Sequence, residues 1–418
     1  MPRSMHFSVP EALPDSLLRN HGGGHAPVSY LELFFDLVYV FAITQVSHFL
    51  LMHPGWSGLI EGVILFLAVW WAWVYTTWVA NWADPERVPV RFVLLVVMFA
   101  SMIMAVAMPK AFGHGRDDMG LVFAASYCGL QILRTAFMVW AMGRDDRAAG
   151  INMVRILCWF VVSACLWFAG ALNHDIGQRI GLWGAALALE YLGPSVGYRV
   201  PGLGRSQPSE WRISGAHMAE RCALFMIIAL GEGIIVTGAS FAALPMMPER
   251  IVSFLLAFLG SVLMWWIYFD RGAARGADHI EHHAEPGRIA RNAFTYLHMP
   301  IVAGVVITAV ADALVLQAPQ GPTPVRLMLF QSVGLLVYLV GVGTFKRFSS
   351  ARGNFPISHG AGVLMVVALA GWTGARQPSA LAFVALSVAI LAMVALWEWV
   401  SFHGGWRERF GQRGNRKA

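Results

Sequence analysis

The stretch "YLELFFDLVYVFAITQVS", Tyr30 to Ser47, is apolar enough to enter a lipid bilayer, yet it carries two carboxylates, Glu32 and Asp36. Residues four apart on an α-helix differ by about 40° around its axis, so these two side chains share one face. A charge near the bilayer centre costs about 2.5–3.5 kcal/mol on insertion scales. The stretch therefore predicts a transmembrane helix whose acidic face is turned toward protein or water.

Apolar segments of this kind recur along all 418 residues. Hydrophobic residues make up 57% of the chain and charged residues only 13%, whereas soluble domains carry about 25% charge. Runs of about 20 apolar residues cross a hydrocarbon core, so we expect an all-α polytopic membrane protein with about twelve transmembrane helices. The predicted spans are 30–52, 58–79, 90–108, 119–142, 153–172, 179–198, 216–242, 251–270, 293–316, 326–345, 358–375 and 379–400.

The spans divide the chain into three predicted parts. Residues 1–29 contain prolines and a glycine run but no apolar core, which predicts a cytoplasmic segment and not a cleaved signal peptide. The transmembrane domain is expected at 30–400, followed by a basic cytoplasmic tail at 401–418. Glu32 and Glu220 open corresponding helices, and "WWAWVY" from Trp70 resembles "WWIYFD" from Trp265. These pairs predict two parallel six-helix repeats, 30–198 and 216–400.

Most of the 30 Lys and Arg residues fall in loops on the amino-terminal side of the predicted spans. Because short cytoplasmic loops retain positive charge, both termini are expected in the cytoplasm. The net charge of +6 is then explained by basic loops facing anionic headgroups. We therefore expect the lipid bilayer and a small solute or proton as partners, and no nucleic acid. The oligomeric state stays open.

Ionisable residues inside the predicted spans lie mostly in their cytoplasmic halves, and such residues usually face protein or water. We expect them to line one acidic polar cavity open to the cytoplasm, where Arg134 and Arg221 meet Glu32 and Asp36. A simpler interpretation of Glu32 and Asp36 is an interfacial pair at a helix amino end, where carboxylates favour the helix dipole. The predicted solute- or ion-binding residues are Glu32, Asp36, Arg134, Glu190, Glu220, Arg221, Glu232, Asp270 and His298.

Two of these residues have helix breakers beside them. Glu232 lies between Gly231 and Gly233, and Pro300 follows His298 by two residues. Unwound backbone in mid-membrane often forms ion or substrate sites, so broken helices are expected at both places. Ordinary packing is the alternative, because Gly and Pro are frequent in membrane helices.

Several segments resemble the bacterial low temperature requirement protein A family. They are "ELFFDLVYVFAITQVSH" from Glu32, "AERCALFMIIALGEGI" from Ala219, "WWIYFD" from Trp265 and "YLHMPIVAGVV" from Tyr296, and the likeness covers about residues 28–400. The resemblance implies a multi-pass protein of the bacterial inner membrane with a link to growth at low temperature. It places Glu32, Asp36, Glu220 and Glu232 at motif positions but implies no agreed activity. Cys222 departs from the family pattern.

No cofactor or metal is expected. The four cysteines all fall inside predicted spans and are typical of packing residues there. "DHIEHHAEP" from Asp278 contains imidazole and carboxylate groups that suit divalent ions, but no fixed ligand spacing supports a metal site.

Three functions fit these observations. The acidic balance of the buried groups favours a proton- or cation-coupled secondary transporter, with Glu32, Asp36, Glu220 and Glu232 as carriers. An intramembrane enzyme acting on a lipid or small hydrophobic substrate would use Glu220 or His298 as its general base. However, the sequence shows no paired nucleophile and no catalytic residue is assigned. A membrane scaffold held by structural ion pairs is the third.

Overall fold

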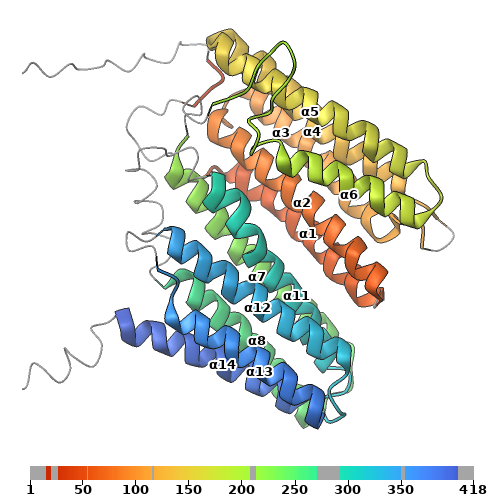
Figure 1. The fold of residues 1–418 in the computed structure, drawn as a ribbon, viewed down its shortest axis with the longest axis vertical. Helices are drawn as coiled ribbons and strands as arrows, with labels where there is room; N and C mark the ends of the chain where they lie inside the picture. Colours follow the sequence, from red (N-terminus) through yellow and green to blue (C-terminus); the bar gives the residue numbers. More distant parts are fainter. Residues whose placement is uncertain are drawn as a thin grey trace, which may run out of the picture. The chain divides into compact units, whose positions relative to one another are not determined.

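The computed structural model describes residues 16–19, 27–53, 55–114, 117–207, 213–270, 291–349 and 354–402. Within these ranges the protein is all-helical, with twelve α-helices and no strand beyond isolated bridges. The helices are α1 Tyr30–Met52, α2 Trp56–Trp82, α3 Val88–Ala107, α4 Gly120–Asp145, α5 Arg147–Ala171, α6 Ile176–Leu192, α7 Gly215–Ala242, α8 Pro248–Phe269, α11 His298–Val315, α12 Val325–Phe348, α13 Ile357–Arg376 and α14 Ala380–Phe402. Figure 1 shows them as long rods.

Eleven of the described helices are long and apolar enough to cross a membrane. The remaining one, α6, has 17 residues and is shorter than the predicted span 179–198. It stops early because Pro194 has no N–H to continue the ladder, and because Gly197 and Tyr198 adopt positive φ of 66° and 47°. The chain is a multi-pass helical membrane protein, as predicted.

Helix starts follow local chemistry. The Asp146 and Asp175 side chains accept hydrogen bonds from the first backbone N–H groups of α5 and α6, as N-caps do. Prolines stand in the first turns of α3 and α8, where their missing N–H costs nothing. Short polar loops therefore separate the apolar rods at defined residues.

The helices fall into two compact units. Over the residues described, unit 1 contains residues up to 42 and 60–221, and unit 2 contains 43–59 and the residues from 222 onward. In unit 1, α3 packs on α4, α4 on α5 and α5 on α6. In unit 2, α11 packs on α12, α12 on α13, α13 on α14 and α14 on α8. Most of these pairs are neighbours in the chain, but α14 and α8 are not. The predicted repeat relation stays a prediction.

Glycines let helices approach closely in each unit. A Cβ added to Gly304 of α11 would lie 2.6 Å from the backbone nitrogen of Tyr338 and 2.8 Å from the Gly334 carbonyl oxygen of α12. In unit 1, a Cβ on Gly150 of α5 would lie 2.7 Å from the Gly143 Cα of α4. Small residues at such contacts are the usual means of tight helix association in membranes.

The two predicted helix breaks have different outcomes. The prediction at Glu232 is wrong, because α7 runs without interruption from Gly215 to Ala242. Gly231 and Gly233, on either side of Glu232, are themselves part of the α-helix. Near Pro300 the backbone does depart from α geometry, since residues Arg291–Leu297 form a π-helix that leads into α11. Pro300 itself lies in the first turn of α11.

Candidate functional site

The acidic face of α1 meets the start of α7 within unit 1. Glu32 Oε1 lies 2.8 Å from His217 Nε2, and Asp36 Oδ1 accepts a 2.8 Å hydrogen bond from Arg221 Nη2. Glu32 and Asp36 are four residues apart on α1, and His217 and Arg221 are four residues apart on α7. The two contacts therefore lie one helical turn apart, between segments that run parallel. All four side chains are at most 2% exposed. Both α1 carboxylates are therefore paired with bases of α7.

Glu32 also has a local structural role. The Ser29 backbone N–H donates to Glu32 Oε2 at 2.8 Å, and the Glu32 N–H donates to Ser29 Oγ at 3.3 Å. This reciprocal pair is a capping box that satisfies the first N–H groups of α1. The Arg19 guanidinium adds an ion pair at 2.9 Å. The interfacial alternative thus accounts for much of Glu32.

Asp36 is different, because it is fully buried and lies past the first turn of the helix. Its Oδ1 accepts from Trp73 Nε1 of α2 at 2.8 Å as well as from Arg221. Its Oδ2, and the Nε and Nη1 of Arg221, have no hydrogen-bond partner within the described part of the chain. Asp36 and Arg221 therefore form a buried ion pair in which both the carboxylate and the guanidinium could make further hydrogen bonds.

A second buried network joins Arg134 to Glu190. Arg134 Nη2 donates to the Gln131 side-chain oxygen, Gln131 Nε2 donates to the Tyr127 hydroxyl at 3.2 Å, and Tyr127 donates to Glu190 Oε2 at 2.5 Å. Ser163 and Trp167 donate to Glu190 Oε1 at 2.6 and 3.0 Å. The two charges are thus linked through neutral side chains of α4.

The two networks of unit 1 both reach α2. Trp73 binds Asp36, and three residues later Thr76 Oγ1 accepts a 2.8 Å hydrogen bond from Arg134 Nη1. Direct contacts therefore bring Arg221, but not Arg134, to the α1 carboxylates among the residues described. The polar groups converge on one helix, while the predicted open cavity stays a prediction.

Glu232 lies deep in α7, in a section that belongs to unit 2. Its Oε2 accepts a 2.5 Å hydrogen bond from Thr44 Oγ1 of α1, and the side chain is 1% exposed. Its Oε1 has no partner, and no ion pair is formed, among the residues that the structure describes. Glu232 therefore differs from Glu32 and Asp36, because a hydroxyl group and not a base faces it.

The remaining predicted residues lie apart from these groups. His298 is buried, with Nε2 2.9 Å from the Tyr268 hydroxyl and Nδ1 2.8 Å from the Ala293 carbonyl oxygen. Both ring nitrogens are thus engaged, which does not suit a general base. Glu220 and Asp270 are half-buried, Asp270 at the end of α8. The histidine-rich segment from Asp278 lies outside the described residues.

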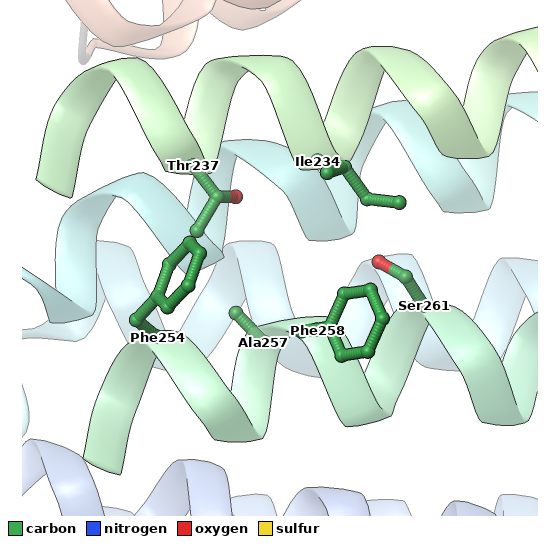
Figure 2. A pocket seen from close by; sticks show the side chains of 6 residues that line it. All are labelled: Ile234, Thr237, Phe254, Ala257, Phe258 and Ser261. Carbon is green, nitrogen blue, oxygen red and sulfur yellow. The ribbon is translucent and has the colours of Figure 1, made fainter. Parts of the chain in front are cut away.

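A small hollow lies between α7 and α8. Figure 2 shows Ile234 and Thr237 of α7 facing Phe254, Ala257, Phe258 and Ser261 of α8. The Thr237 hydroxyl already donates to the Gly233 carbonyl oxygen at 2.7 Å. This lining is mainly apolar and includes none of the nine predicted residues, so the hollow is not the acidic cavity expected from the sequence.

Sequence reasoning missed several partners of the buried charges. These are Arg19, Trp73, Tyr127, Gln131 and His217. A signal for His217 was present, because His217 and Arg221 repeat on α7 the four-residue spacing of Glu32 and Asp36. The indole and hydroxyl donors gave no such signal, since Trp and Tyr are also frequent packing residues in membrane helices.

These features fit one family of membrane proteins. The family model of the bacterial low temperature requirement A protein matches residues 27–398, and the chain belongs to this family, as the motifs predicted. It is also 39% identical over 385 residues to an uncharacterized protein of Rhizobium meliloti (strain 1021), a match that covers 92% of each chain. No solved structure matches. The chain is thus a bacterial multi-pass membrane protein.

Proposed function

We propose that this protein is a secondary transporter that couples the movement of a small cation or basic solute to protons. The observation that carries the proposal is Glu232, a carboxyl group deep in α7 that is bonded to a Thr44 hydroxyl and to no base among the described residues. An unpaired negative charge at this depth is costly. A carboxyl group there is stable when it carries a proton or holds a cation, which is the exchange that a coupled carrier needs.

The α1–α7 pairs supply the rest of the proposed pathway. Asp36 and Arg221 are buried, directly paired and left with unused hydrogen-bonding atoms. Four carboxylates stand on these two helices against Arg221 and His217, namely Glu32, Asp36, Glu220 and Glu232. This balance favours a cation or proton over an anion as the transported species.

The proposal includes a location and an orientation. We infer the bacterial inner membrane, with both termini in the cytoplasm, from the family and from the positive residues on the amino-terminal side. The Glu32, His217, Asp36 and Arg221 group would then lie toward the cytoplasm, and Glu232 farther into the bilayer. The family name adds a link to growth at low temperature, where exchange across a stiffened membrane would be needed.

The test is proton flux in vesicles. Full-length protein would be reconstituted with an internal pH dye and a clamped membrane potential, and a panel of inorganic and organic cations added outside. We expect a cation-dependent pH change that falls at least about tenfold in Glu232→Gln and Asp36→Asn and is kept in Glu86→Gln, whose side chain is 74% exposed. Flux unchanged in both buried variants, or absent with every cation, would overturn the proposal and favour a scaffold.

A further inference from the structure

Unit 2 contains a buried cluster of an acid and two bases outside the predicted site. Lys346 of α12, His359 of α13 and Glu398 of α14 come from three different helices. The Lys346 ammonium lies 2.6 Å from Glu398 Oε2, and His359 Nδ1 lies 3.4 Å from Glu398 Oε1. The three side chains are 9%, 0% and 3% exposed. One carboxylate thus stands between an ammonium and an imidazole.

The two sides of Glu398 are unequally occupied. Oε2 accepts a full hydrogen bond from Lys346, which also donates to the Ile267 carbonyl oxygen of α8 at 2.7 Å. Oε1 has no hydrogen-bond partner over the residues described, and neither does His359 Nε2. The Ser358 hydroxyl lies 3.3 Å from His359 Nδ1. Glu398 Oε1 is therefore the open acceptor of the cluster, and His359 Nδ1, which also contacts the Ser358 hydroxyl, lies 3.4 Å from it.

The charges around this position can be named from each packed element. Asp270 ends α8, three residues after Ile267, and acts electrostatically on both Lys346 and Glu398. Tyr338 of α12 is buried and donates to the Met264 carbonyl oxygen, and His298 of α11 stacks edge-on against Phe345. Two carboxylates thus face one permanent cation. A second positive charge would balance the cluster.

We propose that the Lys346–His359–Glu398 cluster binds a second exchangeable proton in unit 2, in addition to the one proposed at Glu232. The proton comes from water and is held between His359 Nδ1 and Glu398 Oε1, so the cluster gains one positive charge. Glu398 is then shared by two cations, and its attraction for Lys346 weakens while Lys346 keeps the Ile267 carbonyl. Proton binding at α13 and α14 would in this way loosen α12. The inference rests on the proposed transport function and adds a second proton-binding site to it.

A merely structural ion pair makes a different prediction. Removing one partner of a buried ion pair destabilises the folded protein. A purely structural pair between Lys346 and Glu398 would, however, not need an imidazole near the second carboxylate oxygen. In a structural pair, His359 would stay neutral throughout the range in which the protein is folded. The distinguishing quantity is therefore the titration of His359 and its dependence on Glu398.

The test is nuclear magnetic resonance of the full chain in lipid nanodiscs with ¹⁵N-labelled histidine. The His359 signal is assigned by its absence in His359→Gln, or in His359→Asn should the first variant not fold. We expect this signal to titrate in the wild type and to lose that titration step in Glu398→Gln, an amide of the same size. Glu190→Gln, a buried change in unit 1, should leave it unaltered.

Two outcomes would overturn the inference. One is a His359 signal that never titrates while the protein stays folded, and the other is a titration identical in Glu398→Gln and wild type. The flux assay separates this from the wider proposal. If His359 titrates but no cation-dependent flux is found, the proton site is supported and the transport function is refuted. If flux is found but His359 does not titrate, the transport function is supported and the proton site is refuted.

Discussion

The two units handle a buried acid and a buried base in opposite ways. In unit 1, Arg134 of α4 and Glu190 of α6 are joined through Gln131 and Tyr127. In unit 2, Lys346 of α12 and Glu398 of α14 touch at 2.6 Å. The same classes of residue are thus joined through neutral side chains in unit 1 and in direct contact in unit 2.

The difference shows how a membrane protein can place a charge. In unit 1 neutral donors satisfy each oxygen of Glu190, with Tyr127 on one and Ser163 and Trp167 on the other. In unit 2 the charges satisfy each other, which leaves one oxygen of Glu398 for the imidazole. In the bridged network both oxygens of Glu190 have donors, whereas the direct pair leaves one oxygen of Glu398 without a hydrogen bond among the described residues.

The largest expected effect is in the direct pair. Lys346→Met should lower the free energy of unfolding by about 3–5 kcal/mol, because Glu398 is left buried without its cation. Adding Glu398→Leu should recover part of this loss. Unfolding in mixed micelles titrated with dodecyl sulfate measures both. In the matched double-mutant cycle of unit 1, Arg134→Met and Glu190→Gln should show a coupling free energy below about 1 kcal/mol. Equal coupling free energies in the two units would refute the difference between the bridged and the direct pair.

Close helix packing is the next test of the comparison. Gly304→Ala should destabilise unit 2 by about 3 kcal/mol, because the new methyl group meets backbone atoms of α12 that cannot move away. Gly231→Ala in α7 is the control, since an added Cβ there meets nothing within 4 Å. It should be neutral or stabilise the helix by up to about 1 kcal/mol. Thermal unfolding in detergent would show the opposite signs.

Deleting a single oxygen atom breaks the hydrogen-bonded path between Arg134 and Glu190 in unit 1. Tyr127→Phe deletes the hydroxyl that donates to Glu190 and accepts from Gln131, at an expected cost of about 1–2 kcal/mol. In the same unfolding assay, Phe123→Leu changes a buried ring that packs on Tyr127 and Trp167 but removes no hydrogen bond, so it measures the effect of packing alone. A Tyr127→Phe protein as stable as wild type would mean that Arg134 and Glu190 are not joined by this path.

The smallest effect is expected at the ion pair between Asp118, in the loop before α4, and Arg179 of α6 in unit 1. Arg179 donates to Asp118 at 2.9 and 2.7 Å and lowers the pKa of that carboxyl below its usual value. A carboxyl group whose pKa is lower in the folded than in the unfolded protein stabilises the fold at pH values above its unfolded-state pKa. This stabilisation disappears as the pH falls through the folded-state pKa. Because Asp118 is 38% exposed, screening limits it to at most about 1 kcal/mol.

Melting temperatures measured across pH would check this sign. Asp118→Asn should be slightly less stable than wild type near neutral pH, and the two curves should converge in acid. Asp117→Asn serves as a matched control, because its partner Lys110 is itself about half exposed. A difference that grows toward low pH would contradict the ion-pair explanation.

The sequence by itself determined the membrane class, the helices and the family. Hydrophobic runs and breakers placed α1 at 30–52 and α7 near 216–242, within a residue of the observed bounds. Insertion depends on local apolar length and on nearby Pro and Gly, which any window of sequence displays. The motif "ELFFDLVYVFAITQVSH" pointed to the family for the same reason, since it is a contiguous pattern.

Only the tertiary structure decided which donor satisfies each buried charge. Asp36 meets Arg221, but Arg134 turns to Gln131 and Thr76, and Glu398 joins Lys346 and His359, a cluster absent from the sequence prediction. The spacing of residues on one helix gives the face of a side chain but not the helix opposite it. That choice depends on how apolar surfaces and glycine contacts pack the rods together, and packing is a property of the whole chain.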